Sequence, residues 1–344
     1  MPTLKMIGAY AIAAFLLGGT PHSLAADDIG IFETVHMSSV SFEDSNTALE
    51  ASFNASGLLL HATHDVRLPD DAHRARIYVL TSPGYADAAV GESPRTISAQ
   101  VLRVAVYTWG EQQSTYVNMA NPVAHAMVFY ADSSRYDELV AAAAQAADEI
   151  RRAVAAVPGR SVNAQASPLR SEQHYNNYKG DGPARMMAKF RTWKKSQLPI
   201  LTDSADNFDR VVEQVSAALA AGTVGDAAET NGWETVAKIR LRDDAVYLGL
   251  TNPYIEDRMV TINSRFRKDG KSESSPYPGV DHLAALPTDV LIVSEGDETL
   301  VLHYGQMWRM QLYFWDSGYR AFTANVGVPG AIAGSIEKAV SAGN

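Results

Sequence analysis

Apolar and polar residues alternate with a period of two in several short stretches of the first half of the chain, and this pattern predicts strands. Two longer stretches, in which apolar residues recur every three or four positions, predict helices. Consecutive strands with helices on one side predict a two-layer α+β domain with the order β-α-β-β-β-β-α. The predicted elements are a strand at 31–37, a helix at 43–56, strands at 58–67, 74–81, 100–108 and 115–120, and a helix at 135–157.

The second half of the chain carries similar features in the same order. Arginine, tyrosine and tryptophan recur with identical spacing, so a second strand is predicted at 307–315, and a closing helix is predicted at 331–341. Matching features in one order indicate a duplicated domain. The matched positions are Phe42 and Phe208 at two helix starts, Leu80-Thr-Ser-Pro83 and Leu250-Thr-Asn-Pro253, the triplets Arg103, Tyr107, Trp109 and Arg309, Tyr313, Trp315, and Asn118 and Asn325 before Pro122 and Pro329.

The first 25 residues have the layout of a secretory signal peptide. Lys5 precedes an apolar stretch at 6–17, and the small residues Ser23 and Ala25 suit cleavage after Ala25. The apolar stretch is shorter than the roughly 20 residues that a membrane-spanning helix needs, and no later run approaches that length. The chain has no cysteine, and export without disulfides fits a bacterial periplasm. We therefore expect a periplasmic or secreted protein without a transmembrane span.

Charge and composition exclude several classes of function. The formal net charge of −10 argues against a nucleic-acid binder, because neutralising phosphates needs a basic surface. Without cysteine there can be no thiolate nucleophile and no cysteine-ligated metal. No glycine-rich phosphate loop or other cofactor motif occurs, so no cofactor is expected.

A family resemblance rests on the end of the first copy. The strand at 115–120 leads into Asn118-Met-Ala-Asn-Pro122, the Ser82-Pro83 strand end precedes it, and a long closing helix follows. These features resemble the domain-of-unknown-function 302 (DUF302) family, and the chain is similar to a tandem version of it. The family often has Cys-Asn-Pro at the strand end, where this chain has Ser82-Pro83 and Asn252-Pro253, so a thiol role cannot apply here. The resemblance implies a two-layer fold and no particular activity.

The repeat and the resemblance together predict the domain organisation. The fold class is α+β, with two tandem two-layer domains, each an antiparallel sheet with helices on one face (β-α-β4-α). The predicted segments are a signal peptide at 1–25, a first DUF302-like domain at 26–157, a basic linker with an amphipathic helix at 158–199, and a second DUF302-like domain at 200–344 with an insertion near 257–286.

Each predicted Arg-Tyr-Trp strand directs these side chains to the face of the sheet without helices, because alternate residues of a strand face opposite sides. Aromatic rings beside an arginine favour recognition of an amphipathic or anionic ligand. The alternative is that the two faces bury each other between the domains or against a second copy of the chain. The ligand-binding candidates are Arg103, Tyr107, Trp109, Arg309, Tyr313, Trp315, Asn118 and Asn325.

The linker contains a predicted amphipathic helix that Pro183 opens. Met186, Phe190 and Trp193 share one face of it, and cations surround that face. Such a helix docks on its own acidic domains or, as the alternative, touches an anionic membrane surface or an acidic partner.

Motifs of catalysis are missing from the sequence. There is no Gly-x-Ser-x-Gly elbow and no His-Glu-x-x-His, so no catalytic residue is assigned. His303 and Met307 offer imidazole and thioether ligands that suit copper, although core packing explains the methionines better. We expect a non-catalytic periplasmic ligand-binding or accessory protein, whose partner is a small amphipathic or anionic molecule or another periplasmic protein. The alternatives are a hydrolase with a dispersed active site between the two domains and a copper-handling protein.

Overall fold

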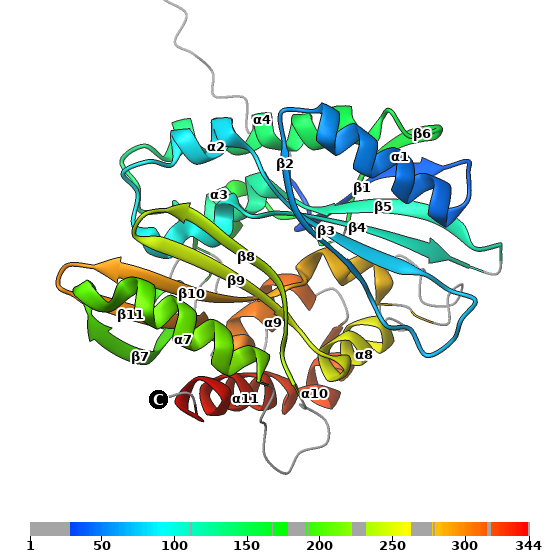
Figure 1. Cartoon of the computed structure of the whole chain (residues 1–344). Coiled ribbons are helices and arrows are strands. Elements are labelled where there is room, and N and C mark those ends of the chain that lie inside the picture. Colours follow the sequence, from blue (N-terminus) through cyan, green and yellow to red (C-terminus); the bar gives the residue numbers. More distant parts are fainter. Residues whose placement is uncertain are drawn as a thin grey trace, which may run out of the picture.

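The computed structural model describes residues 28–110, 112–166, 168–177, 190, 193–221, 232–262, 277, 279–314 and 318–342 (Figure 1). The signal peptide predicted at 1–25 lies outside these residues. The first half contains β1 (Phe32–Ser38), α1 (Phe42–Ala55), β2 (Leu59–Asp65), β3 (Ala75–Thr81), α2 (Pro83–Ala88), the short 3-10 helix η1 (Pro94–Gln100), β4 (Leu102–Trp109), β5 (Ser114–Ala120), α3 (Pro122–Phe129), α4 (Tyr136–Val154) and β6 (Gly159–Gln165).

The second half begins after two short helices, α5 (Glu172–Asn177) and α6 (Trp193–Ser196). It contains β7 (Gln197–Ser204), η4 (Ala205–Asn207), α7 (Phe208–Ala220), β8 (Glu234–Arg242), β9 (Ala245–Thr251), α8 (Pro253–Thr261), the 3-10 helix η7 (Val280–Ala285), β10 (Thr288–Glu295), β11 (Glu298–Tyr304), α9 (Gln306–Phe314), α10 (Gly318–Ala324) and α11 (Val328–Ala342).

The two sheets have the same topology. The first has the strand order β2-β3-β4-β5-β1-β6, and the second, counted from β8, has the order β8-β9-β10-β11-β7. All the paired strands are antiparallel. The predicted α+β class with two antiparallel sheets is therefore confirmed, and the first sheet has one additional strand, β6, beside β1.

The helix starts at the strand ends show why the same local sequence folds alike twice. Ser82 caps α2 and Asn252 caps α8, each through a side-chain oxygen that accepts from the backbone N–H three residues on. Pro83 and Pro253 occupy the first helical turn, where a missing N–H costs no hydrogen bond. The matched segments 80–83 and 250–253 are thus the same strand-to-helix corner.

Helices cover the outer face of each sheet. α1 and α4 pack on the first sheet, and α7 and α11 pack on the second (Figure 1). Phe53 of α1 lies edge-on to Tyr78 of β3 with ring centroids 5.5 Å apart, and the Tyr78 hydroxyl donates to Asn46 of α1. The opposite faces of the two sheets point toward each other, with η1 and η7 packed between them.

One predicted strand is wrong. Residues 306–314 form the helix α9, and the second-half counterparts of β4 and β5 are β10 and β11. Trp308 and Arg309 are buried together with Leu312 and Tyr313, four positions on, which is helical spacing. The arginine, tyrosine and tryptophan spacing shared with 103–109 is therefore a coincidence between a strand and a helix. A periodic pattern this short does not separate the two.

The predicted linker and insertion also need correction. Residues 159–165 of the linker form β6, which pairs with β1 and extends the first sheet. Within the insertion near 257–286, residues 257–261 belong to α8 and 280–285 form η7, which correspond to α2 and η1 of the first half. Most of the predicted amphipathic helix lies outside the described residues. Phe190 and Trp193 are nonetheless buried, and Trp193 contacts the ring of Phe129.

Within the part of the chain that the structure describes, we find no helix both long and apolar enough to span a bilayer.

Candidate functional site

A buried polar cluster lies where the two sheets face each other. Arg103 of β4 and Asp289 of β10 occupy the same position in the two repeats, since Arg103 pairs with Val79 and Asp289 with Gly249 in matching registers. Arg103 Nη1 lies 3.6 Å from Asp289 Oδ1. Arg309 Nη1 donates to Asp289 Oδ2 at 2.8 Å, and the Tyr247 hydroxyl donates to Oδ1 at 2.8 Å. One carboxylate thus serves two guanidinium groups.

His125 of α3 and Tyr313 of α9 complete this cluster. Arg103 Nη2 donates to the Tyr313 hydroxyl at 2.7 Å, and that hydroxyl lies 2.8 Å from His125 Nε2. Burial, together with the charges of Arg103 and Arg309, holds the pKa of His125 well below its usual value. His125 is therefore neutral, and its Nε2 accepts a hydrogen bond from the Tyr313 hydroxyl. That hydroxyl in turn accepts a hydrogen bond from Arg103.

Burial decides what this cluster can do. Arg103 and His125 are each 2 % exposed, and Asp289 is equally enclosed. Arg103 Nε and Nη1 make no hydrogen bond to any of the described residues. A substrate could not reach these groups without separating the two halves. The cluster therefore forms part of the interface between the two repeats.

A salt-bridge clamp joins the neighbouring edges of the sheets, where β2 and β8 lie side by side. Glu256 of α8 is fully buried and accepts from His64 Nε2 at 2.7 Å, from the Arg67 backbone N–H at 2.9 Å and from the Thr251 hydroxyl at 2.9 Å. His64 Nδ1 also lies 3.3 Å from Glu234. Burial by itself would lower the pKa of His64, but the hydrogen bond and charge of Glu256 outweigh it and the pKa is raised.

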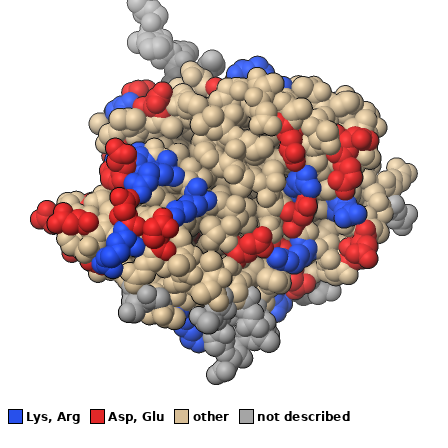
Figure 2. Space-filling view, viewed as in Figure 1, with Lys and Arg blue, Asp and Glu red and all other residues tan. Residues whose placement is uncertain are grey.

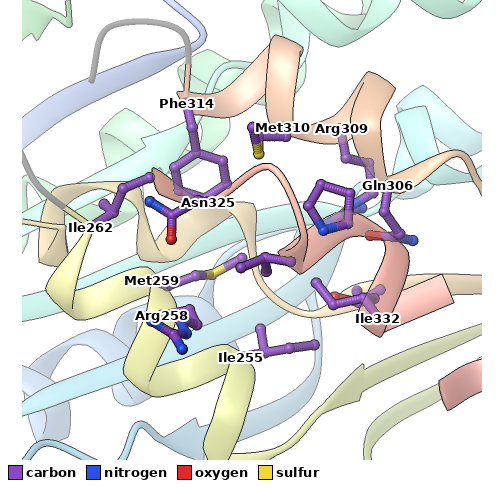
Figure 3. A pocket seen from close by; sticks show the side chains of 13 residues that line it. Ile255, Arg258, Met259, Ile262, Gln306, Arg309, Met310, Phe314, Asn325 and Ile332 are labelled. Carbon is purple, nitrogen blue, oxygen red and sulfur yellow. The ribbon is translucent and has the colours of Figure 1, made fainter. Parts of the chain in front are cut away.

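An apolar pocket opens in the second half between α8, α9 and α11. Figure 3 shows side chains from these helices converging on it, with Arg258 of α8 at one side and Phe314 at another. The pocket has a volume of about 60 Å³, counted as the space that the centre of a water molecule can occupy. It is lined by Ile255, Arg258, Met259, Ile262, Thr288, Gln306, Arg309, Met310, Phe314, Asn325, Val328, Pro329 and Ile332.

The two arginines of this pocket differ in their roles. Arg309 is 4 % exposed, and its guanidinium is bound to Asp289 and to the Ala285 carbonyl. Arg258 is exposed, and its guanidinium carbon lies 5.2 Å from the centre of the Tyr254 ring. Of these two arginines, Arg258 is the one that can turn toward a ligand without breaking a buried ion pair.

A second pocket, of about 180 Å³ by the same measure, lies on the inward face of the first sheet. Tyr107 and Trp109 of β4 line it together with Tyr116 of β5 and Thr34 of β1. Asp281 of η7, in the second half, also lines this pocket. The Asn118 side chain of β5 donates to the Asp281 carbonyl at 3.0 Å and so fixes η7 over the sheet.

Comparison with known proteins identifies no family for this chain. No protein-family model matches the chain, and no curated protein matches it. Among solved structures, the crystal structure of the uncharacterized conserved protein DUF302 from Bacillus stearothermophilus is similar, with 16 % sequence identity and a TM-score of 0.31. The similarity covers 37 % of this chain and 98 % of that chain. That protein is uncharacterized, so the similarity implies no activity.

The structure places the predicted site residues in different parts of the molecule. Arg103, Arg309 and Tyr313 lie in the cluster between the halves, whereas Tyr107 and Trp109 line the aromatic pocket. The face of β4 that was expected to be free of helices is covered in part by η7. Asn118 holds η7, Asn325 lines the apolar pocket, and Trp315 lies outside the described residues.

The copper alternative named His303 and Met307. His303 of β11 is fully buried, with Nδ1 3.0 Å from the Tyr304 carbonyl and Nε2 3.4 Å from Glu337 of α11. Met307 lies in the first turn of α9 and is half-buried. Within the described ranges, no group of three or more histidine, aspartate and glutamate side chains is arranged to hold a metal ion.

Five residues of these sites were not predicted from the sequence: Asp289, His125, Asp281, Tyr116 and Arg258. A signal for Asp289 was present, because an aspartate directly before the apolar run at 290–293 must find a partner when it is buried. For Asp281 there was none, since its pocket forms only when η7 crosses onto a sheet built from residues more than 150 positions earlier.

Proposed function

We propose that this protein is a non-catalytic binding protein for a small amphipathic molecule with an anionic group, held in the apolar pocket of the second half. The observation that carries the proposal is an apolar pocket with an exposed arginine at its side. Apolar pockets with a few polar groups are the usual sites for small ligands. The apolar part of the ligand would contact Met259, Phe314 and Ile332, and its anionic group would pair with Arg258.

The polar lining of the pocket suits recognition. Gln306, Thr288 and Asn325 add amide and hydroxyl groups to the guanidinium of Arg258. Such groups orient a ligand by hydrogen bonds and do not titrate near neutral pH. For this reason we favour binding over the alternative of a hydrolase. The cluster between the two domains is the natural place for a dispersed active site, but its side chains are sealed from solvent.

We further propose that the protein acts in the periplasm after cleavage of the signal peptide, as an accessory protein that carries or presents its ligand. Support comes from the tripartite layout of residues 1–25 and from the complete lack of cysteine. Figure 2 shows positive and negative side chains interleaved in two groups on either side of a broad uncharged area. Such mixed charge does not favour a polyanionic partner.

The pocket can be tested with two probes, the amphipathic anion dodecanoate and the neutral dodecanol. Ile332→Trp fills the pocket, so it is expected to weaken dodecanoate binding at least about tenfold, measured by isothermal titration calorimetry. Arg258→Gln is expected to weaken dodecanoate several-fold, in line with a charge-assisted hydrogen bond, and to leave dodecanol unchanged.

Two variants outside the pocket serve as controls. Leu59→Trp adds the same bulk at an exposed position of β2, and Arg240→Gln removes an arginine that pairs with Asp209 on the surface. Neither is expected to change dodecanoate binding. Equal binding by Ile332→Trp and the unaltered protein would reject the pocket as the ligand site.

A further inference from the structure

The aromatic pocket of the first sheet brings together three rings and one carboxylate. Tyr107 and Tyr116 lie nearly parallel, with centroids 6.0 Å apart and planes at 17°. Trp109 stands at 69° to Tyr107 with centroids 6.3 Å apart. Asp281 borders the same space, and its Oδ1 lies 3.1 Å from Nδ1 of His282. Ring surfaces of different orientation therefore border a space that also contains a negative charge.

Strand register explains why these rings meet. Tyr107 and Tyr116 are directly paired across β4 and β5, and Trp109 is two residues beyond Tyr107 on the same face. η7 supplies Asp281 from the second half. His282 secures this position, because its ring stacks on Phe314 at 5.1 Å and meets Phe32 edge-on at 5.3 Å. The carboxylate is thus held in place by contacts on both sides of the interface.

The fold itself does not require these rings. By register, the second-half counterparts of Tyr107 and Tyr116 are Val293 and Leu300, which pair in the same way across β10 and β11. Both are buried. In contrast, Trp109 and Tyr116 are half-buried and border an open space. An aliphatic pair occupies the equivalent position in the closed core of the second half. Core packing alone therefore does not explain the aromatic rings of the first half.

We propose that this pocket binds a small organic cation, a methylated ammonium group. The faces of aromatic rings carry negative potential, and quaternary ammonium groups are bound in cages of such rings. A carboxylate at the border adds charge complementarity, and a volume of about 180 Å³ is sufficient for a trimethylammonium group. The site is separate from the apolar pocket and independent of the function proposed for it.

The charge requirement can be tested on the unaltered protein. Choline and 3,3-dimethyl-1-butanol have the same shape, but only choline carries a charge. Titration calorimetry is expected to show choline binding at least about tenfold tighter, a difference of about 1.4 kcal/mol and within the range of a desolvated cation–π contact. Equal affinity for the two, or no choline binding at millimolar concentration, would overturn the proposal.

The location of the site requires variants. Trp109→Leu and Asp281→Asn are each expected to weaken choline binding at least several-fold, while the far-ultraviolet circular dichroism spectrum stays that of the unaltered protein. Tyr254→Leu, which removes a half-buried ring of α8 outside the pocket, is the matched control and is expected to bind choline normally. An unchanged circular dichroism spectrum shows that the variants are folded. Unchanged choline affinity in Trp109→Leu would place the cation elsewhere and reject the pocket.

Discussion

Replacing Asp289 with alanine is expected to lower the free energy of unfolding by about 3–5 kcal/mol, the usual cost of removing one partner of a buried ion pair. The carboxylate serves Arg309 at 2.8 Å and Arg103 at 3.6 Å, and it also accepts from Tyr247. Without it, two buried guanidinium groups lie close together with no counter-charge. Urea unfolding followed by circular dichroism measures the loss.

A surface carboxylate offers the matched control for this experiment. Asp209 of α7 is exposed and pairs with Arg240 on the surface. Asp209→Ala is expected to cost less than about 1 kcal/mol, because an exposed ion pair is screened by water. Similar losses in Asp209→Ala and Asp289→Ala would show that Asp289 does not bind the halves together. Because the cluster joins both repeats, Asp289→Ala is also expected to separate one unfolding transition into two.

The repeat explains why this cluster is shared between the halves. Arg103 and Asp289 stand at equivalent positions, as do His125 and Arg309. η1 of the first half packs on β9 and β10 of the second half, and η7 of the second half packs on β3 and β4 of the first half. Such reciprocal contacts are typical of a two-fold symmetric interface, which here lies within one chain. After duplication, opposite charges at matched positions can attract across the axis, which identical residues could not do.

Local sequence was sufficient for most of the first half. Strands and helices there follow clear periods, and the corners at Ser82-Pro83 and Asn252-Pro253 form as caps with proline in the first turn. The strand predicted at 307–315 was wrong because a nine-residue apolar pattern fits either a strand or a helix. The stronger signal was Gly296-Asp297, a two-residue turn between the apolar runs of β10 and β11, with Gly296 at a φ of +63°.

The candidate site was less predictable than the fold. Arg103 and Tyr107 were singled out correctly as residues of one sheet face, since alternation along β4 places them there. Which of them meets the other half depends on how the sheets pack, and no local pattern encodes that. Arg103 is sealed against Asp289, whereas Tyr107, only four residues on, borders an open pocket. Residues on one face of β4 thus contribute both to the interface between the halves and to the wall of the pocket.

Replacing Glu256 with alanine is expected to cost about 3–5 kcal/mol near pH 5.5, because His64 and Arg67 lose their buried counter-charge. The cost should depend on pH. The raised pKa of His64 means that its pairing stabilises the fold below pH 6.5 and that this contribution is lost as the pH rises through the folded-state pKa. The pKa of Glu256 is lowered, although burial opposes this, so its contribution is present above pH 4.5 and is lost on further acidification.

The two titrations leave a window between about pH 4.5 and 6.5 in which the clamp between β2 and α8 is complete. Urea unfolding of the unaltered protein and of Glu256→Ala at pH 5.5 and pH 9 tests this. The difference between the two proteins is expected to be larger at pH 5.5. His64→Leu provides the check, since it removes the titrating group and should make the cost of Glu256→Ala nearly independent of pH in this range. A pH-independent cost with His64 present would mean that Arg67 and Thr251 alone account for the role of Glu256.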